Sequence, residues 1–121
     1  MSLQTRYGGL ETEAVGGVTV VTFRDRQILT EAAVQALGQQ LLGLAAGSGR
    51  RRLVLNFGNV RQLSSAVLGQ VVALDRAVRQ AGGRLSLCGV RPDLAHLLTV
   101  TRLDRYLDLY PSEGEALQSL L

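Results

Sequence analysis

Residues 53–81 read LVLNFGNVRQLSSAVLGQVVALDRAVRQA. The first five residues are almost all apolar, which is typical of a strand that helices cover on both faces of a sheet. The polar residues 58–63 predict a loop. Two adjacent serines, Ser64 and Ser65, then open a helical pattern that runs to about Gln80. The stretch therefore predicts a buried strand, a connecting loop and a helix whose first turn carries two hydroxyls.

The helix expected over residues 65–80 has one strongly apolar face, which includes Val71. At about 100° per residue, five residues including Val71 fall within an arc of about 80° and should pack on the sheet. They are Val67, Val71, Leu74, Val78 and Ala81. Leu68 and Val72 fall to one side of this face, beside two arginines. That position should leave both side chains accessible to a partner.

Downstream of this helix, a strand is expected over residues 84–90. A third helix should open at Pro92, because proline in the first turn lacks only an N–H that would have no partner inside the helix. Residues 107–110 predict a last short strand. Ser112 and Glu115 form a capping box, which predicts a final helix near the end of the chain.

Upstream, residues 1–10 are expected to be a loosely ordered start. The Gly16-Gly17 pair lies between two extended runs and predicts a hairpin turn. Thr30 is a candidate N-cap for a helix over residues 31–46, which a Gly-Ser-Gly sequence should end. The three arginines at 50–52 are interpreted as a solvated entrance to the central strand rather than a nucleic-acid patch.

Strands and helices alternate after the hairpin, so these strands should be parallel and joined by crossover helices. The expected fold is α/β, a mixed sheet with a parallel core and an antiparallel N-terminal hairpin strand, flanked by about four helices. The chain has 121 residues and no linker, repeat or low-complexity segment. We therefore expect a single domain over residues 1–121.

Composition removes several classes of function. All 13 basic residues are arginine, so no lysine is present for a P-loop, a Schiff base or a phosphoacceptor receiver domain. One histidine, His96, and one cysteine, Cys88, make neither a metal cluster nor a catalytic pair. We expect no enzyme activity, no metal and no cofactor.

Charge and hydropathy also bound the partners. The formal net charge of +3 is small and the aromatic residues are scattered, so no nucleic-acid surface is predicted. No apolar run is long enough to span a membrane, and residues 1–10 lack the layout of a secretory signal. The lone Cys88 fits a reducing compartment. A cytoplasmic location is therefore expected.

Ser64 and Ser65 have two interpretations. A serine at the start of a helix is an ordinary N-cap. Two serines in succession exceed what one cap requires, and the second would lie near free backbone N–H groups that favour a phosphate. Spacing alone leaves both interpretations open.

The corner at residues 60–69, VRQLSSAVLG, resembles the STAS domain, the module of sulfate transporters and anti-sigma factor antagonists. The resemblance extends from about residue 18 to residue 117. Further matching segments are the strand at 53–57, GGRL at 82–85 and TRLDRYL at 101–107. The resemblance implies the same mixed sheet that the hydrophobic pattern predicts.

In soluble members of that family the corner usually reads Asp-Ser-Ser-Gly, and a partner kinase phosphorylates the second serine. Ser65 matches that serine, and Ser64, its neighbour, is the second choice. Leu63 replaces the family's aspartate, Ala66 replaces its glycine, and Thr30 stands where many members carry an aspartate. The loss of the aspartate removes a carboxylate that could orient the serine or contact the kinase.

The resemblance implies partner switching. The unphosphorylated antagonist binds an anti-sigma factor, a serine kinase of the histidine-kinase-like ATPase type, and frees the sigma factor. Phosphorylation breaks this binding and a PP2C-type phosphatase restores it. The surface expected to bind the partner consists of Arg26, Thr30, Leu63, Ser64, Ser65, Ala66, Leu68 and Val72.

The alternative is a STAS scaffold that is not phosphorylated and serves a larger signalling, lipid-related or transport-related complex. In that case the two serines only cap the helix. The sequence leaves open whether the protein acts alone, as a homodimer or within a larger assembly.

Overall fold

The computed structural model describes residues 4–7, 10–46 and 52–121. They form a six-stranded sheet in the order β1-β2-β3-β5-β7-β8 and a separate pair of short strands, β4 and β6. The strands of the large sheet are β1 (Gln4–Tyr7), β2 (Leu10–Val15), β3 (Val18–Phe23), β5 (Arg52–Asn56), β7 (Arg84–Cys88) and β8 (Asp108–Tyr110). β1, β2 and β3 pair antiparallel, whereas β3, β5, β7 and β8 pair parallel. The predicted mixed sheet with a parallel core is confirmed.

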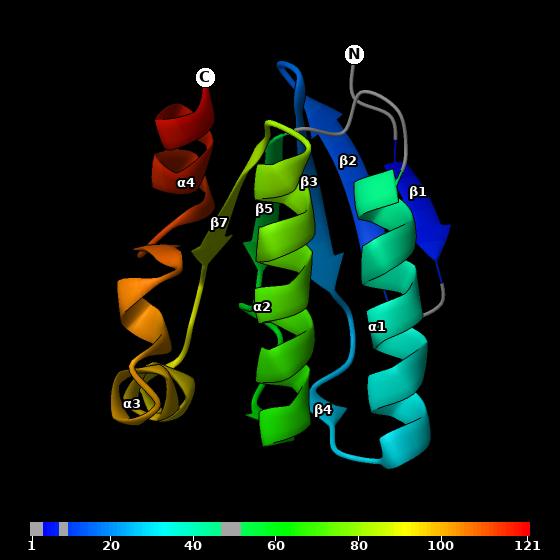
Figure 1. The fold of residues 1–121 in the computed structure, drawn as a ribbon, viewed down its shortest axis with the longest axis vertical. Helices are drawn as coiled ribbons and strands as arrows, with labels where there is room; N and C mark the ends of the chain where they lie inside the picture. Colours follow the sequence, from blue (N-terminus) through cyan, green and yellow to red (C-terminus); the bar gives the residue numbers. More distant parts are fainter. Residues whose placement is uncertain (1–3, 8–9, 47–51) are drawn as a thin grey trace.

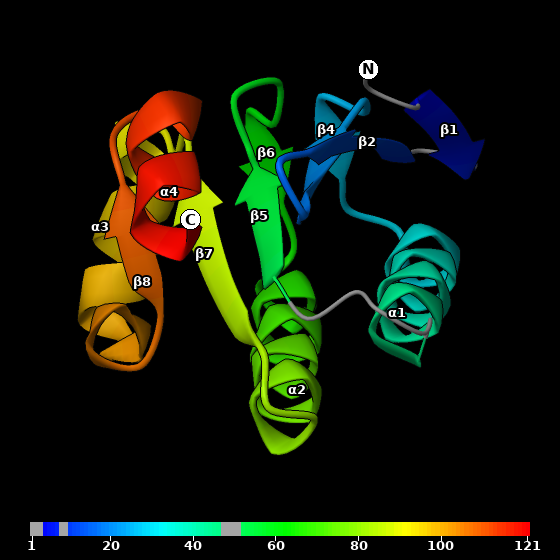
Figure 2. The same cartoon turned by 90° about the horizontal axis from the view of Figure 1, so that it is seen from above.

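Helices cover both faces of the sheet (Figures 1 and 2). They are α1 (Glu31–Ala46), α2 (Ser65–Gln80), α3 (Pro92–Val100) and α4 (Glu113–Leu120), and a 3₁₀ turn, η1 (Leu103–Arg105), follows α3. Side chains of α1, α2 and α3 share one hydrophobic core with the sheet, and α2 is the middle helix in Figure 1. α4 packs on the opposite face, against β5, β7 and β8.

The central strand β5 is buried on both faces, as its apolar sequence predicts. Leu53 and Leu55 point into the core beneath α1 and α2, whereas Val54 packs in the core beneath α4. Phe57 follows the strand directly and stacks on Phe23, with ring centroids 4.4 Å apart. These contacts fix the end of β5, from which the chain continues into the loop before Ser64 and Ser65.

The predicted hairpin joins β2 to β3 through Gly16 and Gly17. Their φ angles are +56° and +83°. Two consecutive residues with positive φ make the tight turn whose twist matches that of paired strands, and glycine adopts this conformation without steric cost.

The start of the chain differs from the expectation. Residues 4–7 are not loose, because β1 pairs with β2 in a regular antiparallel register from Gln4↔Glu13 to Tyr7↔Leu10. The sequence QTRY carries no apolar alternation, so only the backbone ladder reveals this strand. Residues 1–3 and 8–9 lie outside the described residues, as do 47–51 with the predicted helix stop and two of the three arginines.

The apolar face of α2 is confirmed for Val67, Val71, Leu74 and Val78, all of which are buried. The prediction is wrong for Ala81. It is exposed because α2 ends at Gln80, so Ala81 forms the C-cap beyond the part of the helix that lies on the sheet.

Gly89 is expected to be essential for the connection that follows β7. Its φ is +69°, and a Cβ there would lie 2.9 Å from the backbone nitrogen of Gly58. Gly89→Ala should therefore lower the free energy of unfolding by about 1–3 kcal/mol, measured by urea titration. Gly43→Ala is the matched control, because Gly43 lies in α1 with open space around its Cβ position. Equal effects of the two substitutions would contradict this account of Gly89.

Candidate functional site

The two serines at the start of α2 have different environments. Ser64 is the N-cap, with extended φ and ψ of −68° and 145°, and its Oγ accepts a hydrogen bond from the Ala66 backbone N–H at 3.2 Å. Ser65 is the first residue of the helix and is exposed. Among the residues that the structure describes, none hydrogen-bonds the Ser65 hydroxyl. The cap is therefore provided by Ser64, and the Ser65 hydroxyl is available for chemistry.

The N-terminal end of α2 favours a nearby negative charge. Aligned peptide dipoles place partial positive charge at a helix N-terminus, and the first backbone N–H groups have no partner within the helix. The first turn of α2 contains no acidic residue that would repel a phosphate. A phosphoryl group on Ser65 could therefore be accommodated without melting the helix.

A short parallel pair of strands ties the loop at 24–29 to the serine corner. β4 (Gln27–Ile28) pairs with β6 (Gln62–Leu63). The backbone carbonyl of Arg26 accepts hydrogen bonds from the Arg61 and Gln62 N–H groups, at 2.8 and 3.1 Å. The Ser64 N–H donates to the Ile28 carbonyl at 2.8 Å. These contacts hold the loop beside the start of α2, and the exposed Arg26 side chain belongs to the same corner.

Thr30 caps α1, as the sequence predicts. Its Oγ1 accepts a hydrogen bond from the Ala33 N–H at 3.1 Å, and its side chain is exposed. Figure 1 shows that α1 and α2 begin at the same end of the molecule, on either side of β4. The starts of both helices and the β4–β6 pair therefore form one surface, which we call the serine corner surface (residues 24–31 and 61–66).

Two shallow hollows border this surface. One has a volume of about 370 Å³ and is lined by Leu29, Glu31, Val34, Gln35, Ser64, Ala66 and Gln70. The other has a volume of about 340 Å³ and is lined by Leu29, Arg61, Gln62, Leu63, Asp93, Leu94 and Leu97. Leu29 lines both hollows and is 51% exposed. The sequence signal for Leu29 is its place directly after the buried Ile28 at the end of β4, because successive side chains of an extended chain point in opposite directions.

Ala66 is exposed and Leu63 is half-buried against the main core. The prediction that Leu68 belongs to the accessible surface is wrong. Leu68 is only 3% exposed and is part of the main core. α2 is the middle helix of its layer, so more of its surface is covered than the predicted apolar face. The buried Leu68 belongs to this additional covered surface.

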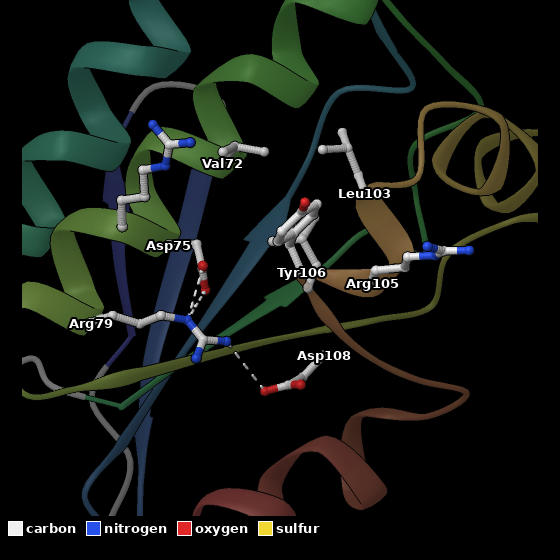
Figure 3. A pocket seen from close by; sticks show the side chains of 9 residues that line it. Val72, Asp75, Arg79, Leu103, Arg105, Tyr106 and Asp108 are labelled. Carbon is white, nitrogen blue, oxygen red and sulfur yellow. Dashed lines mark hydrogen bonds and ion pairs between the residues drawn. The ribbon is translucent and has the colours of Figure 1, made fainter.

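Val72 is half-buried, but it does not line either hollow of the serine corner surface. It lines a separate hollow between α2 and the η1–β8 segment, shown in Figure 3, which we call the α2–η1 pocket. Seven helical positions separate Val72 from Ser65, about 10 Å along the helix axis. The sequence analysis assigned Ser65 and Val72 to one surface, but the structure places them in different parts of the molecule.

The single cysteine and the single histidine of the chain lie outside the serine corner surface. Cys88 is buried, and its burial, with a smaller contribution from the nearby Glu113 charge, raises the pKa of the thiol to about 11. The thiol is therefore protonated at neutral pH, as expected of an inert cysteine. His96 is exposed on α3. No cluster of three potential metal ligands occurs in residues 4–7, 10–46 and 52–121, and no helix there could cross a membrane.

Comparison with known proteins decides the family. The family model described as the STAS domain matches residues 10–116. The chain belongs to the STAS domain family. This STAS domain is 29% identical over 68 residues to the anti-sigma F factor antagonist of Paenibacillus polymyxa. That match covers 56% of this chain and 58% of the relative, so it spans less than two thirds of the relative's length.

Solved structures support the same fold. An anti-sigma-factor antagonist (STAS) domain protein from Planctomyces limnophilus superposes with a TM-score of 0.82 at 22% identity, covering 92% of this STAS domain and 97% of that chain. The Bacillus cell fate determinant SpoIIAA in its phosphorylated form has a TM-score of 0.69 at 14% identity, with 100% of both chains covered. At such identities the likeness shows a common fold.

Ser64→Ala is expected to destabilise this STAS domain by about 1 kcal/mol, because it removes the hydroxyl that caps α2. Ser65→Ala is the matched control and should change the free energy of unfolding by less than about 0.5 kcal/mol, because the Ser65 side chain is exposed. Urea titrations of both variants measure the difference. If Ser65→Ala lowered the free energy of unfolding more than Ser64→Ala, the assignment of Ser64 as the N-cap of α2 would be wrong.

Proposed function

We propose that this STAS domain is an anti-sigma factor antagonist whose binding to a serine-kinase anti-sigma factor is controlled by phosphorylation of Ser65. The observation that carries the proposal is the division of roles at the start of α2. Ser64 is engaged as the N-cap, whereas the adjacent Ser65 is exposed and its hydroxyl makes no hydrogen bond with any residue that the structure describes. The antagonist names of the relatives support the same role.

The partner would dock on the serine corner surface. Leu29 offers an exposed apolar anchor between two hollows, and Arg26 and Arg61 flank it with exposed charges. Such an arrangement of a central apolar residue with a polar rim is common in protein interfaces. A docked partner would bury Ser65, so a phosphate there would have to lose its water at a contact fitted to a neutral hydroxyl.

In this scheme the unphosphorylated domain binds the anti-sigma factor, a kinase of the histidine-kinase-like ATPase type, and so frees a sigma factor. The kinase transfers phosphate to Ser65 and thereby releases the domain. A PP2C-type phosphatase reverses the modification. The domain itself performs no catalysis in the scheme, which operates in the cytoplasm.

Phosphosite mapping tests the proposal. The domain is incubated with its cognate kinase and Mg-ATP, and the phosphate is located by mass spectrometry in the unmodified sequence and in Ser64→Ala and Ser65→Ala. We expect phosphate on Ser65, retained in Ser64→Ala and lost in Ser65→Ala.

A scaffold role is the second candidate, and one observation favours it. Leu63 and Ala66, on either side of the serines, depart from the aspartate and glycine that soluble family members usually carry. The scaffold role would be favoured if, in the mapping experiment, a kinase of proven activity on another antagonist left both serines without phosphate.

A further inference from the structure

The α2–η1 pocket lies outside the serine corner surface and has no part in the proposed switch. Its volume is about 700 Å³, within the range of pockets that hold small molecules. Its lining comes from two segments, the second half of α2 and the chain from η1 to β8 (Figure 3). The lining residues are Val72, Asp75, Arg76, Arg79, Leu103, Arg105, Tyr106, Leu107 and Asp108.

The two carboxylates of the pocket are already paired. Both oxygens of the buried Asp75 accept hydrogen bonds from Arg79 Nε, at 3.1 and 3.0 Å. The same guanidinium reaches Asp108 at 3.7 Å, and Arg84 approaches Asp108 at 3.8 Å. Figure 3 shows Arg79 between the two carboxylates. These pairs neutralise the acidic groups and hold Arg79 in place, so the pocket does not suit a cation.

Two further arginines of the lining are not neutralised. Arg76 and Arg105 are exposed, and neither has an ion pair or a side-chain hydrogen bond with any residue in the described part of the chain. They come from the two segments that border the pocket, α2 and η1. The lining therefore carries an excess of positive charge, which favours an anion. In Figure 3 the Arg105 side chain extends away from Tyr106, so this exposed side chain would turn toward the pocket to contact a ligand.

The rest of the lining is apolar. Val72, Leu103 and Leu107 contribute aliphatic surface, and the side chain of Tyr106 is 69% exposed. In Figure 3 the Tyr106 ring stands between Val72 and Asp108, with Leu103 beside it. An exposed aromatic ring next to free guanidinium groups can stack on a flat apolar group. A bare inorganic anion would leave this surface uncovered.

We propose that the α2–η1 pocket binds a small organic anion, a carboxylate or phosphate attached to an aromatic or similarly flat apolar body. Arg76 and Arg105 attract the anionic group, and their exposed side chains turn toward it on binding. The Tyr106 ring and the aliphatic side chains cover the body. The site is independent of Ser65, so its failure would leave the proposed switch untouched.

Titration of the ¹⁵N-labelled domain with phenyl phosphate, followed by NMR, tests this proposal. Phenol and inorganic phosphate at equal concentrations serve as probes of the two halves of the ligand. We expect chemical-shift changes confined to residues 72–79 and 103–108 with phenyl phosphate, and much smaller changes with either half. Binding should also weaken as salt is added, because exposed charges are screened. Equal changes with inorganic phosphate, or no localised changes with phenyl phosphate, would overturn the proposal.

Substitutions assign the binding to these residues. Arg76→Ala and Arg105→Ala should each weaken phenyl phosphate binding about tenfold, the usual effect of losing one charge-assisted hydrogen bond. Tyr106→Ala should weaken phenyl phosphate binding but not the response to inorganic phosphate. Arg91→Ala is the matched control, since Arg91 is exposed at the start of α3 and makes no capping bond. If Arg91→Ala weakened binding as much as Arg76→Ala, the attraction would be non-specific and the proposed site would be wrong.

Discussion

Ser65→Asp is expected to weaken binding of the anti-sigma factor roughly 100-fold or more. Ser65 is exposed in the free domain, so a carboxylate there is solvated and costs little. Docking on the serine corner surface would strip water from the same carboxylate at a contact fitted to a neutral hydroxyl, and a buried charge that is not compensated typically costs about 3–5 kcal/mol. Isothermal titration calorimetry with the purified partner measures the change.

Two control variants separate charge from shape. Ser65→Asn has nearly the same size as the aspartate variant but no charge, so it should retain most of the affinity. Ser65→Ala should bind like the unmodified domain, and its fold should be unaffected because Ser64 supplies the cap. If the asparagine and aspartate variants lost equal affinity, the effect would be steric and the electrostatic account of the switch would be wrong.

Phe57→Ala should lower the free energy of unfolding by about 3–5 kcal/mol, the usual cost of removing a fully buried aromatic side chain. Phe57 is 1% exposed and stacks on Phe23. Its backbone N–H also donates to the Cys88 carbonyl at 2.9 Å, which joins the ends of β5 and β7. Urea unfolding followed by circular dichroism measures the loss.

Tyr106→Ala is the control for this substitution, because it removes an aromatic ring that is 69% exposed. Its effect on stability should stay within about 0.5 kcal/mol. A loss of less than about 1.5 kcal/mol for Phe57→Ala would mean that the stacked pair contributes little and that the corner is fixed by other contacts.

The sequence predicted the elements that carry strong local signals. The hairpin followed from Gly16-Gly17, which must adopt positive φ, and α1 and α2 followed from long apolar periodicity and from capping hydroxyls. β1, β4 and β6 were missed, because strands of two to four residues with polar sequences are defined by backbone pairing with distant segments. The hydrophobic pattern within such a short strand does not indicate which strand it pairs with.

The sequence predicted the placement of the candidate site residues well at the start of α2 and less well farther along this helix. Arg26 and Thr30 were expected on one surface with the two serines, and the β4–β6 pair and the cap of α1 bring them there. Leu68 was misplaced because helical periodicity gives a direction but not the width of the covered arc, which depends on the neighbouring helices. The α2–η1 pocket was not predicted, since its two segments meet only in the folded chain.

The most direct test of the account compares the domain with and without phosphate on Ser65. Both forms are prepared from the same chain, and their affinities for the purified anti-sigma factor are measured by calorimetry, with circular dichroism to verify that the fold is unchanged. The account predicts tight binding by the unmodified form and a loss of roughly 100-fold or more in the phosphorylated form. Equal affinities for two well-folded forms would contradict it.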